Sequence, residues 1–432
     1  MEATRENLPG NAKLAIANIR TFISQVPLLC WLLGILVAIA LEHLVGYQLA
    51  RGLGLPKVPG LFGFTVILKK PQLIPSIMLY LLVIYILPIG VVMRLGAAWL
   101  NRLAGKLLDF PMWVSVLIHL GLLYASLHWW SEMSLYRVEV LKFTLIAVLL
   151  TLSLNVINGY MGEFSCSHPG FMALGAYASS VFTVWLFADD RIFGAALLPK
   201  AIGPFFFPIA LIFGGLVAAV GALAVAVPSF RTRGDYLAII SLAFMFIVKN
   251  LIENLEFVGG ARGLGDQPAW ANRPAVFITV VVGIWIINNF VRSTYGKALN
   301  AVRDNELAAD AMTVNTRRTK ITAFLFAAFW AGVAGGLFAH ALRYVNPGTF
   351  GIQKLAEVLA MVYFGGLNSI YGSIVGATGI SLLGEVLRPL ELYKWIFIPL
   401  LLVLVMIFRP TGLIAFKEFS VRKLVQPKKT SM

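Results

Sequence analysis

The chain has 432 residues, of which 59% are hydrophobic and only 13% are charged. Soluble domains are about 45–50% apolar and about 25% charged, so this composition excludes an ordinary soluble globular protein. In so apolar a chain, the formal net charge of +15 indicates basic cytoplasmic loops rather than a nucleic-acid-binding surface.

Apolar segments recur along the whole chain, separated by polar or glycine-rich residues. They cover residues 27–50, 73–93, 110–130, 138–157, 171–188, 205–227, 236–252, 275–291, 321–342, 355–367, 373–387 and 395–408. A membrane-spanning helix needs about 20 mostly apolar residues, so we predict an all-α polytopic integral membrane protein with about 10–12 transmembrane helices. Segments 355–367 and 373–387 are short, and the glycines around them favour a broken or re-entrant pair.

Four regions are predicted from this pattern. Residues 1–26 form a cytoplasmic N-terminal tail of mixed charge that does not resemble a cleaved signal peptide. Residues 27–135 form an extension with extra spans, residues 136–413 form the core, and residues 414–432 form a basic cytoplasmic tail. Lys and Arg are more frequent in the loops that this order places inside, including a loop with Arg94, Arg102 and Lys106, so both termini are expected in the cytoplasm.

Small residues recur at the spacing of helix contacts. Examples are Gly214 with Ala218, Gly332 with Gly336 and Gly372 with Gly376. Such pairs let helix backbones approach closely in lipid, although glycine is also common in spans without any such role.

Residues 292–320 form a long polar stretch between two apolar segments. Its apolar positions have helical spacing, and Asp304 or Asn305 is placed to cap a short helix. We expect a helix that lies against the membrane and docks on another protein, and a solvated cytoplasmic loop is the alternative. The apolar positions of that helix are Leu299, Val302, Leu307, Ala311 and Met312.

Residues 158–178 are rich in Gly, Ser and aromatic residues, yet they begin and end inside apolar segments. A broken helix at membrane depth lines a cavity in many transporters, where free backbone groups bind a polar substrate. Glu163 and His168 add titratable groups, and an ordinary turn between two spans explains the same residues. The isolated charges Lys142 and Lys249 are expected to reach toward an interface, and Glu42 and His43 either pair or face headgroups.

Enzyme chemistry has little support in this sequence. The Gly-Lys pairs at 105–106 and 296–297 are followed by Leu107 and Ala298 instead of the Ser or Thr of a phosphate-binding loop. No His or Cys spacing typical of a metal site occurs, and Cys30 and Cys166 are far apart. We therefore expect no catalytic residue, no metal and no cofactor bound by this chain.

Four separated blocks together resemble the permease subunits of branched-chain amino acid ABC importers, the LivM-type family. They are GYMGEFSCSHPGFMALGAYA, RGDYLAIISLAF with GGARGL, GKALNAVRDNELAADAMTVN with Lys320, and FGGLNSIYGSIVGA. The resemblance covers about residues 138–413. It implies a transport subunit of the bacterial inner membrane that moves substrate by alternating access, with ATP hydrolysed by another subunit.

The resemblance also implies partners and site residues. The partners are a second permease subunit in a heterodimer, two cytoplasmic ATPases, a periplasmic substrate-binding protein and the lipid bilayer, without nucleic acid. Residues implied to couple to the ATPase are Gly296, Ala301, Arg303, Asp304, Glu306, Ala309 and Asp310. Residues implied to shape the pathway are Gly159, Tyr160, Glu163, Ser165, His168, Gly365, Gly366 and Asn368.

Several positions depart from the family pattern, which usually has Gln at Glu163 and Glu at Phe246. Related permeases for urea and short-chain amides share these blocks, so urea or a short-chain amide is an alternative substrate. An ion-coupled secondary transporter is a further alternative, for which the candidate carboxylates are Glu42, Glu163, Glu357 and Glu385.

Overall fold

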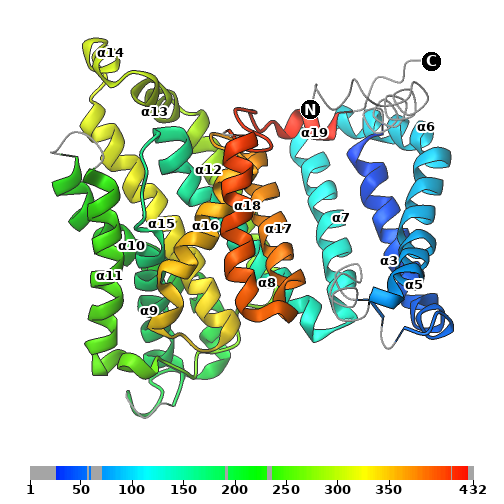
Figure 1. Cartoon of the computed structure of the whole chain (residues 1–432), viewed down its shortest axis with the longest axis horizontal. Coiled ribbons are helices and arrows are strands. Elements are labelled where there is room, and N and C mark those ends of the chain that lie inside the picture. The colour runs from blue at the N-terminus through cyan, green and yellow to red at the C-terminus, as the bar shows by residue number, and fades with distance from the viewer. Residues whose placement is uncertain are drawn as a thin grey trace. The chain divides into compact units, whose positions relative to one another are not determined.

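The structure is a computed structural model that describes residues 26–55, 58–59, 71–189, 193–230, 236–409 and 411–426. Residues 1–25 and 427–432, which make up most of the two predicted tails, lie outside the described residues. The regular structure in the described part is helical, so the predicted all-α class is confirmed. The chain divides into two compact units, residues 1–137 with 420–432 and residues 138–419 (Figure 1).

Among the described residues, nine helices are long and apolar enough to cross a membrane, which confirms the polytopic class. Two shorter apolar helices, Ile370–Val386 and Ile396–Phe408, follow them. The nine are Leu28–Gly52, Ile74–Leu107, Met112–Glu132, Leu135–Met161, His168–Phe187, Lys200–Ser229, Tyr236–Asn254, Arg273–Arg292 and Thr316–Leu342.

The first unit contains α3 (Leu28–Gly52), a long interrupted helix, α7 (Met112–Glu132) and the short α19 (Val421–Val425). The interrupted helix begins with η2 (Pro71–Leu73) and α5 (Ile74–Leu81), passes through the π-helix η3 (Leu82–Ile86), and ends with α6 (Leu87–Asp109). The loop predicted around Arg94, Arg102 and Lys106 is therefore wrong, because these residues lie within α6. The hydropathy falls there, but Leu and Ala between the charged residues sustain the helix.

A fully buried ion pair holds the first unit together. The carboxylate of Glu42 in α3 is 0% exposed and accepts hydrogen bonds from both guanidinium nitrogens of Arg137, at 2.9 and 3.1 Å. The same carboxylate accepts from the hydroxyls of Tyr80 and Tyr85, at 3.2 and 2.6 Å. Both carboxylate oxygens thus have two donors each, which satisfies a charge that would be costly to bury alone.

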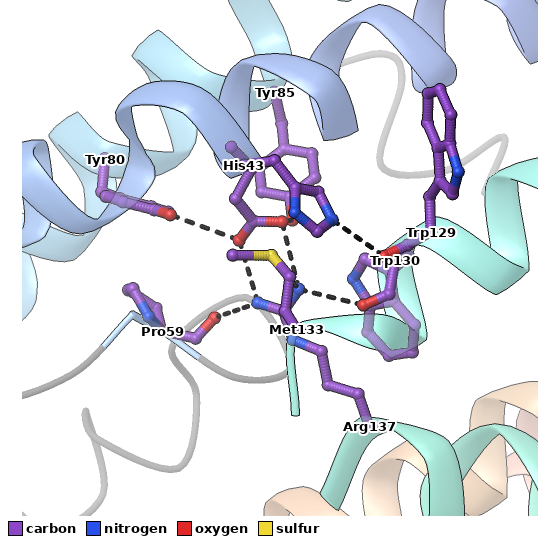
Figure 2. Close-up of polar contacts among 9 residues, drawn as sticks. His43, Pro59, Tyr80, Tyr85, Trp129, Trp130, Met133 and Arg137 are labelled. Carbon is purple, nitrogen blue, oxygen red and sulfur yellow. Dashed lines mark hydrogen bonds and ion pairs between the residues drawn. The ribbon is translucent and has the colours of Figure 1, made fainter. Parts of the chain in front are cut away.

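The π-helix explains why both tyrosines reach one carboxylate. Residues five apart in a regular α-helix point about 140° away from each other, whereas the i→i+5 turn of a π-helix brings such residues to the same side. Tyr80 and Tyr85 are five residues apart, and η3 lies between α5 and α6 at this point (Figure 2).

The guanidinium of Arg137 makes further contacts on its other sides. It donates to the carbonyls of Pro59 and Trp130, at 3.2 and 3.3 Å, and lies 5.1 Å from the centre of the Trp130 ring (Figure 2). The predicted pairing of Glu42 with His43 is wrong, because Glu42 pairs with Arg137 and His43 hydrogen-bonds the carbonyl of Trp129 at 3.0 Å. Glu42 is also too deeply buried to face headgroups, whereas His43 is exposed.

The second unit contains the remaining helices, except that the first three residues of α8, which include Arg137, belong to the first unit. Proline occupies the first turn of α9, α10 and α12, where its missing N–H leaves no helical bond unmade. In chain order the elements are α8 (Leu135–Asn155), η4 (Val156–Met161), α9 (His168–Phe187), η5 (Lys200–Ile202), α10 (Gly203–Ser229), α11 (Tyr236–Asn254), η6 (Glu256–Val258), η7 (Gly260–Arg262), α12 (Arg273–Arg292), α13 (Thr294–Asp304), α14 (Glu306–Ala311), α15 (Thr316–Leu342), η8 (Pro347–Phe350), α16 (Ile352–Gly365), α17 (Ile370–Val386), η9 (Arg388–Tyr393) and α18 (Lys394–Phe408).

Helices α9, α10 and α15 pack backbone against backbone at the predicted small residues. A Cβ on Gly175 of α9 would lie 2.2 Å from the carbonyl oxygen of Gly332 in α15. A Cβ on Gly332 would lie 2.6 Å from the Cβ of Ala218 in α10. A Cβ on Gly335 would lie 2.0 Å from the carbonyl oxygen of Met172. The close-packing prediction for the small residues is confirmed here, and the three helices form one tightly fitted group.

Helices α16 and α17 form the predicted short pair. Their lengths of 14 and 17 residues correspond to about 21 and 25 Å, which is less than the roughly 30 Å hydrocarbon core. Gly366 has a φ of +130° in the turn between them, and a Cβ on Gly365 would lie 2.0 Å from the carbonyl oxygen of Gly372. Glycine is therefore required for both the turn and the close approach.

Candidate functional site

The polar stretch 292–320 folds into two helices at one end of the second unit (Figure 1). Helix α13 ends at Asp304, the next residue is extended with φ −160°, and α14 begins at Glu306. The side chain of Asn305 accepts a hydrogen bond from the amide of Ala308 at 3.0 Å, so Asn305 is the cap, and the alternative with Asp304 is wrong.

The break at Asn305 also divides the predicted apolar face. Gly296, Leu299 and Val302 are buried on α13, but Leu307 and Met312 are 72% and 77% exposed. The single amphipathic stripe was therefore an incorrect prediction, because a stripe needs one continuous helix. The structure instead gives α13 an inward apolar face and leaves Leu307 in α14 and Met312 beside it largely exposed.

Arg303 joins α13 to the turn that follows η4. Its guanidinium donates to the carbonyl of Gly159 at 3.4 Å and to Asp304 at 2.8 Å, and it lies 5.5 Å from the centre of the Phe416 ring. The aliphatic part of Arg303 fills the space beside Gly162, where a Cβ would lie 2.4 Å from its Cγ. Gly162 also has a φ of +77°, so both the conformation and the contact require glycine.

Lys320 joins the same turn to α14. Its ammonium lies 2.7 Å from Glu163 Oε1 in the turn and 2.9 Å from Glu306 Oε2 in α14. Lys320 is only 8% exposed, whereas the side chains of Glu163 and Glu306 are 28% and 50% exposed. Two carboxylates thus compensate one nearly buried ammonium, and three separate elements meet at one charge.

The remaining residues implied to couple to the ATPase fall into two sets. Gly296 and Ala309 are buried, and a Cβ on Gly296 would lie 2.0 Å from the carbonyl oxygen of Val291. Ala301, Asp304 and Asp310 are exposed. The structure therefore brings the whole predicted set into one hairpin of helices, with part of it facing inward and part facing outward.

The residues implied to shape the pathway lie around the turn at the same end of the unit. Tyr160, Ser165 and His168 are buried, and Ser165 Oγ lies 2.9 Å from Ser167 Oγ. Cys166 lies in this turn, where burial raises the pKa of its thiol. Glu163 is bound to Lys320 of α15, which also binds Glu306 of α14, so that ammonium links the turn to the α13–α14 hairpin.

The sequence analysis did not identify Asn155, which joins the end of α8 to the α16–α17 hairpin. Its amide nitrogen donates to Ser373 Oγ at 2.7 Å and to the Ser369 carbonyl at 3.1 Å, and its oxygen accepts from the Asn368 amide at 3.1 Å. A Cβ on Gly159 would lie 1.9 Å from that oxygen. An asparagine late in an apolar helix is the signal that marks it, because a buried amide needs partners.

Each of the four carboxylates considered for ion coupling has a basic partner. Besides Glu42 with Arg137 and Glu163 with Lys320, Glu357 lies 2.8 Å from Lys354 and Glu385 lies 3.4 Å from Arg388. Unpaired acidic residues in a span are what a proton or sodium site needs. Within the described part of the chain, no group of three or more His, Cys, Asp or Glu side chains forms a candidate metal site.

The family model and the relatives that match over most of this chain describe the same kind of transport permease. The family model described as "Branched-chain amino acid transport system / permease component" matches residues 136–408. The chain is 31% identical over 329 residues to the high-affinity branched-chain amino acid transport system permease protein LivM of Escherichia coli K12, covering 68% of this chain and 73% of the relative. LivM of Salmonella typhimurium is also 31% identical, covering 68% of this chain and 74% of the relative.

A more distant relative is the autoinducer 2 import system permease protein LsrC of Enterobacter sp. 638. It is 27% identical over 153 residues, covering 34% of this chain and 43% of the relative. No solved structure matches this chain.

Proposed function

The chain belongs to the family of branched-chain amino acid transport-system permease components, and we propose that it carries a branched-chain or other hydrophobic amino acid. It is a multi-pass membrane transport subunit. In the proposed mechanism ATP is hydrolysed by a separate subunit, and the permease alternates between states open to either side of the membrane.

The proposed assembly contains a second, different permease, two cytoplasmic ATPases and a periplasmic substrate-binding protein in the bacterial inner membrane. Both termini of this chain and the hairpin α13–α14 are proposed to face the cytoplasm. A substrate-binding protein then acts on the opposite end of the second unit, where η6, η7 and η8 lie. ATP serves the partners and is not a cofactor of this chain.

The observation that carries the coupling part of this proposal is the exposure of Leu307 and Met312. Large apolar side chains more than 70% exposed at the tip of a short, well-anchored helix favour contact with a partner protein over contact with water. Arg303 and Lys320 hold this helix pair on the turn after η4. A partner protein that binds α14 and moves it can therefore also move the turn after η4.

The first test is purification of the chain from membranes with its partners. We expect a soluble ATPase and a second permease to co-purify stoichiometrically. Leu307→Asp and Met312→Asp should each release the ATPase, while Leu197→Asp, which changes a leucine 60% exposed on a different loop, should not. Retention of the ATPase by both α14 variants would contradict the coupling assignment.

The second test concerns substrate and energy source, with the complete assembly in liposomes. Uptake of leucine that needs ATP inside and the binding protein outside supports the proposal. Uptake of urea or acetamide in place of leucine would favour the amide-permease alternative. Uptake that collapses with an uncoupler while ATP stays constant would favour ion coupling instead.

A further inference from the structure

We propose that Lys320 is a positioning residue that transmits movement of α14 to the α9–α10–α15 group by holding Glu306 and Glu163 at once. The proposal rests on the proposed function, because it concerns how the coupling hairpin acts on the rest of the permease. It assigns the transmission to one ammonium and two carboxylates in this chain.

The first argument is the position of the ammonium between three elements. Lys320 lies near the N-terminal end of α15, Glu306 is the first residue of α14, and Glu163 lies in the turn before α9. The pairs of Lys249 with Glu253 and of Lys354 with Glu357, in contrast, each stay within one helix. Pairs within a helix stabilise that helix, whereas the Lys320 pairs fix separate elements relative to each other.

The second argument is that the hairpin has two attachment points. Arg303 contacts η4 at Gly159 and the following turn at Gly162, and Lys320 contacts that turn at Glu163. One contact alone would let the hairpin pivot about Arg303. With the second contact in place, a displacement of α14 must displace the turn or break a charge-assisted bond of 2.7 Å.

The third argument is what lies behind Lys320. Its helix α15 packs on α9 with backbone contacts at Gly335 and through Gly175 at Gly332, and α10 packs on Gly332 through Ala218. Close-packed groups of this kind move as units rather than deforming, because interiors have few voids. A displacement received near the N-terminal end of α15 therefore reaches α9 and α10 together.

The fourth argument is the burial of the ammonium. Lys320 is 8% exposed, and a nearly buried charge is costly unless it is paired. Loss of one carboxylate leaves the other to compensate it, so the pairs can loosen one at a time. The two carboxylates are more exposed than the ammonium, so the ammonium is the group of the three that depends most on keeping its pairs.

The test measures solute transported per ATP hydrolysed in the reconstituted assembly. Lys320→Met removes the charge and keeps the length, and we expect the ATPase to stay bound and active while uptake per ATP falls about fivefold or more. Lys320→Arg keeps the charge and should restore most of the ratio. Glu163→Gln should lower the ratio as well, because only the Glu306 pair then remains.

The matched control is Lys354→Met, which breaks an ion pair of similar length within α16 and should leave uptake per ATP unchanged. An unchanged ratio in Lys320→Met would overturn the proposal, and so would an equal fall in Lys354→Met, since that indicates a general loss of stability. If Lys320→Met does not assemble, Glu163→Gln decides in its place. A wild-type assembly without ATP-driven uptake would refute the proposed function itself, which is a separate outcome.

Discussion

Removal of either partner of the Glu42–Arg137 pair should destabilise the first unit strongly, whereas removal of both should cost little more than removal of one. The two side chains are 0% and 3% exposed, with a nitrogen-to-oxygen distance of 2.9 Å. Breaking a buried pair from one side leaves an uncompensated charge and costs about 3–5 kcal/mol. Screening by water does not reduce this figure, because neither group reaches solvent.

The two single variants leave different charged groups uncompensated. Arg137→Met leaves the Glu42 carboxylate with only the hydroxyls of Tyr80 and Tyr85. Glu42→Leu leaves the guanidinium with two carbonyls and a tryptophan ring. Each single change should lower the apparent Tm by roughly 6–20 °C, if a unit of this size follows the usual relation between free energy and Tm.

The double variant Glu42→Leu/Arg137→Met removes both charges together. Its remaining cost is the loss of the hydrogen bonds that the Tyr80 and Tyr85 hydroxyls donate to Glu42, at about 1–3 kcal/mol each. The assay is a double-mutant cycle from thermal unfolding of the detergent-solubilised chain, with Lys249→Met as a control for a partly exposed i,i+4 pair worth about 0.5 kcal/mol or less. Additivity of the two single effects within about 0.5 kcal/mol would refute the reasoning.

Two further predictions use glycines that have matched controls. Gly162→Ala should displace Arg303 and lower uptake. The control is Gly194→Ala, at a glycine of similar positive φ with nothing within 4 Å, which should cost only the backbone strain of about 1–2 kcal/mol. Equal uptake in the two variants would contradict the role assigned to Gly162. Gly335→Ala should destabilise the second unit by about 1–3 kcal/mol through overpacking. Gly384→Ala, at a glycine with open space around it, should not destabilise the unit. Equal Tm values for the two variants would show that the close packing at Gly335 is not needed.

The sequence predicted the helices well because hydropathy and helix signals act locally. Most predicted segments agree with a helix to within a few residues, as 236–252 does with α11 (Tyr236–Asn254) and 275–291 does with α12 (Arg273–Arg292). The failure at Arg94, Arg102 and Lys106 has the same local origin. A hydropathy window ends where charges appear, although a helix continues as long as its backbone bonds are made.

The candidate site was predicted in part. Glu163 and Lys320 were both noted in the sequence, but their contact joins residues 157 positions apart, and hydropathy carries no information about which helices are neighbours. The division of the apolar face at Asn305 was missed for a different reason. Helical spacing continues across the break, so Leu307 and Met312 appear to share a face with Leu299 until the extended residue turns the chain.

Opposite charges within or beside the apolar segments are the signal that connects these observations. A charge in a span is costly alone, so its presence predicts a partner of opposite sign at a similar depth. Glu42 has Arg137, and Glu163 has Lys320. In the first unit the Glu42–Arg137 pair is buried and stabilises the fold. In the second unit the ammonium is shared between two partly exposed carboxylates on separate elements, which is the arrangement that can change during a transport cycle.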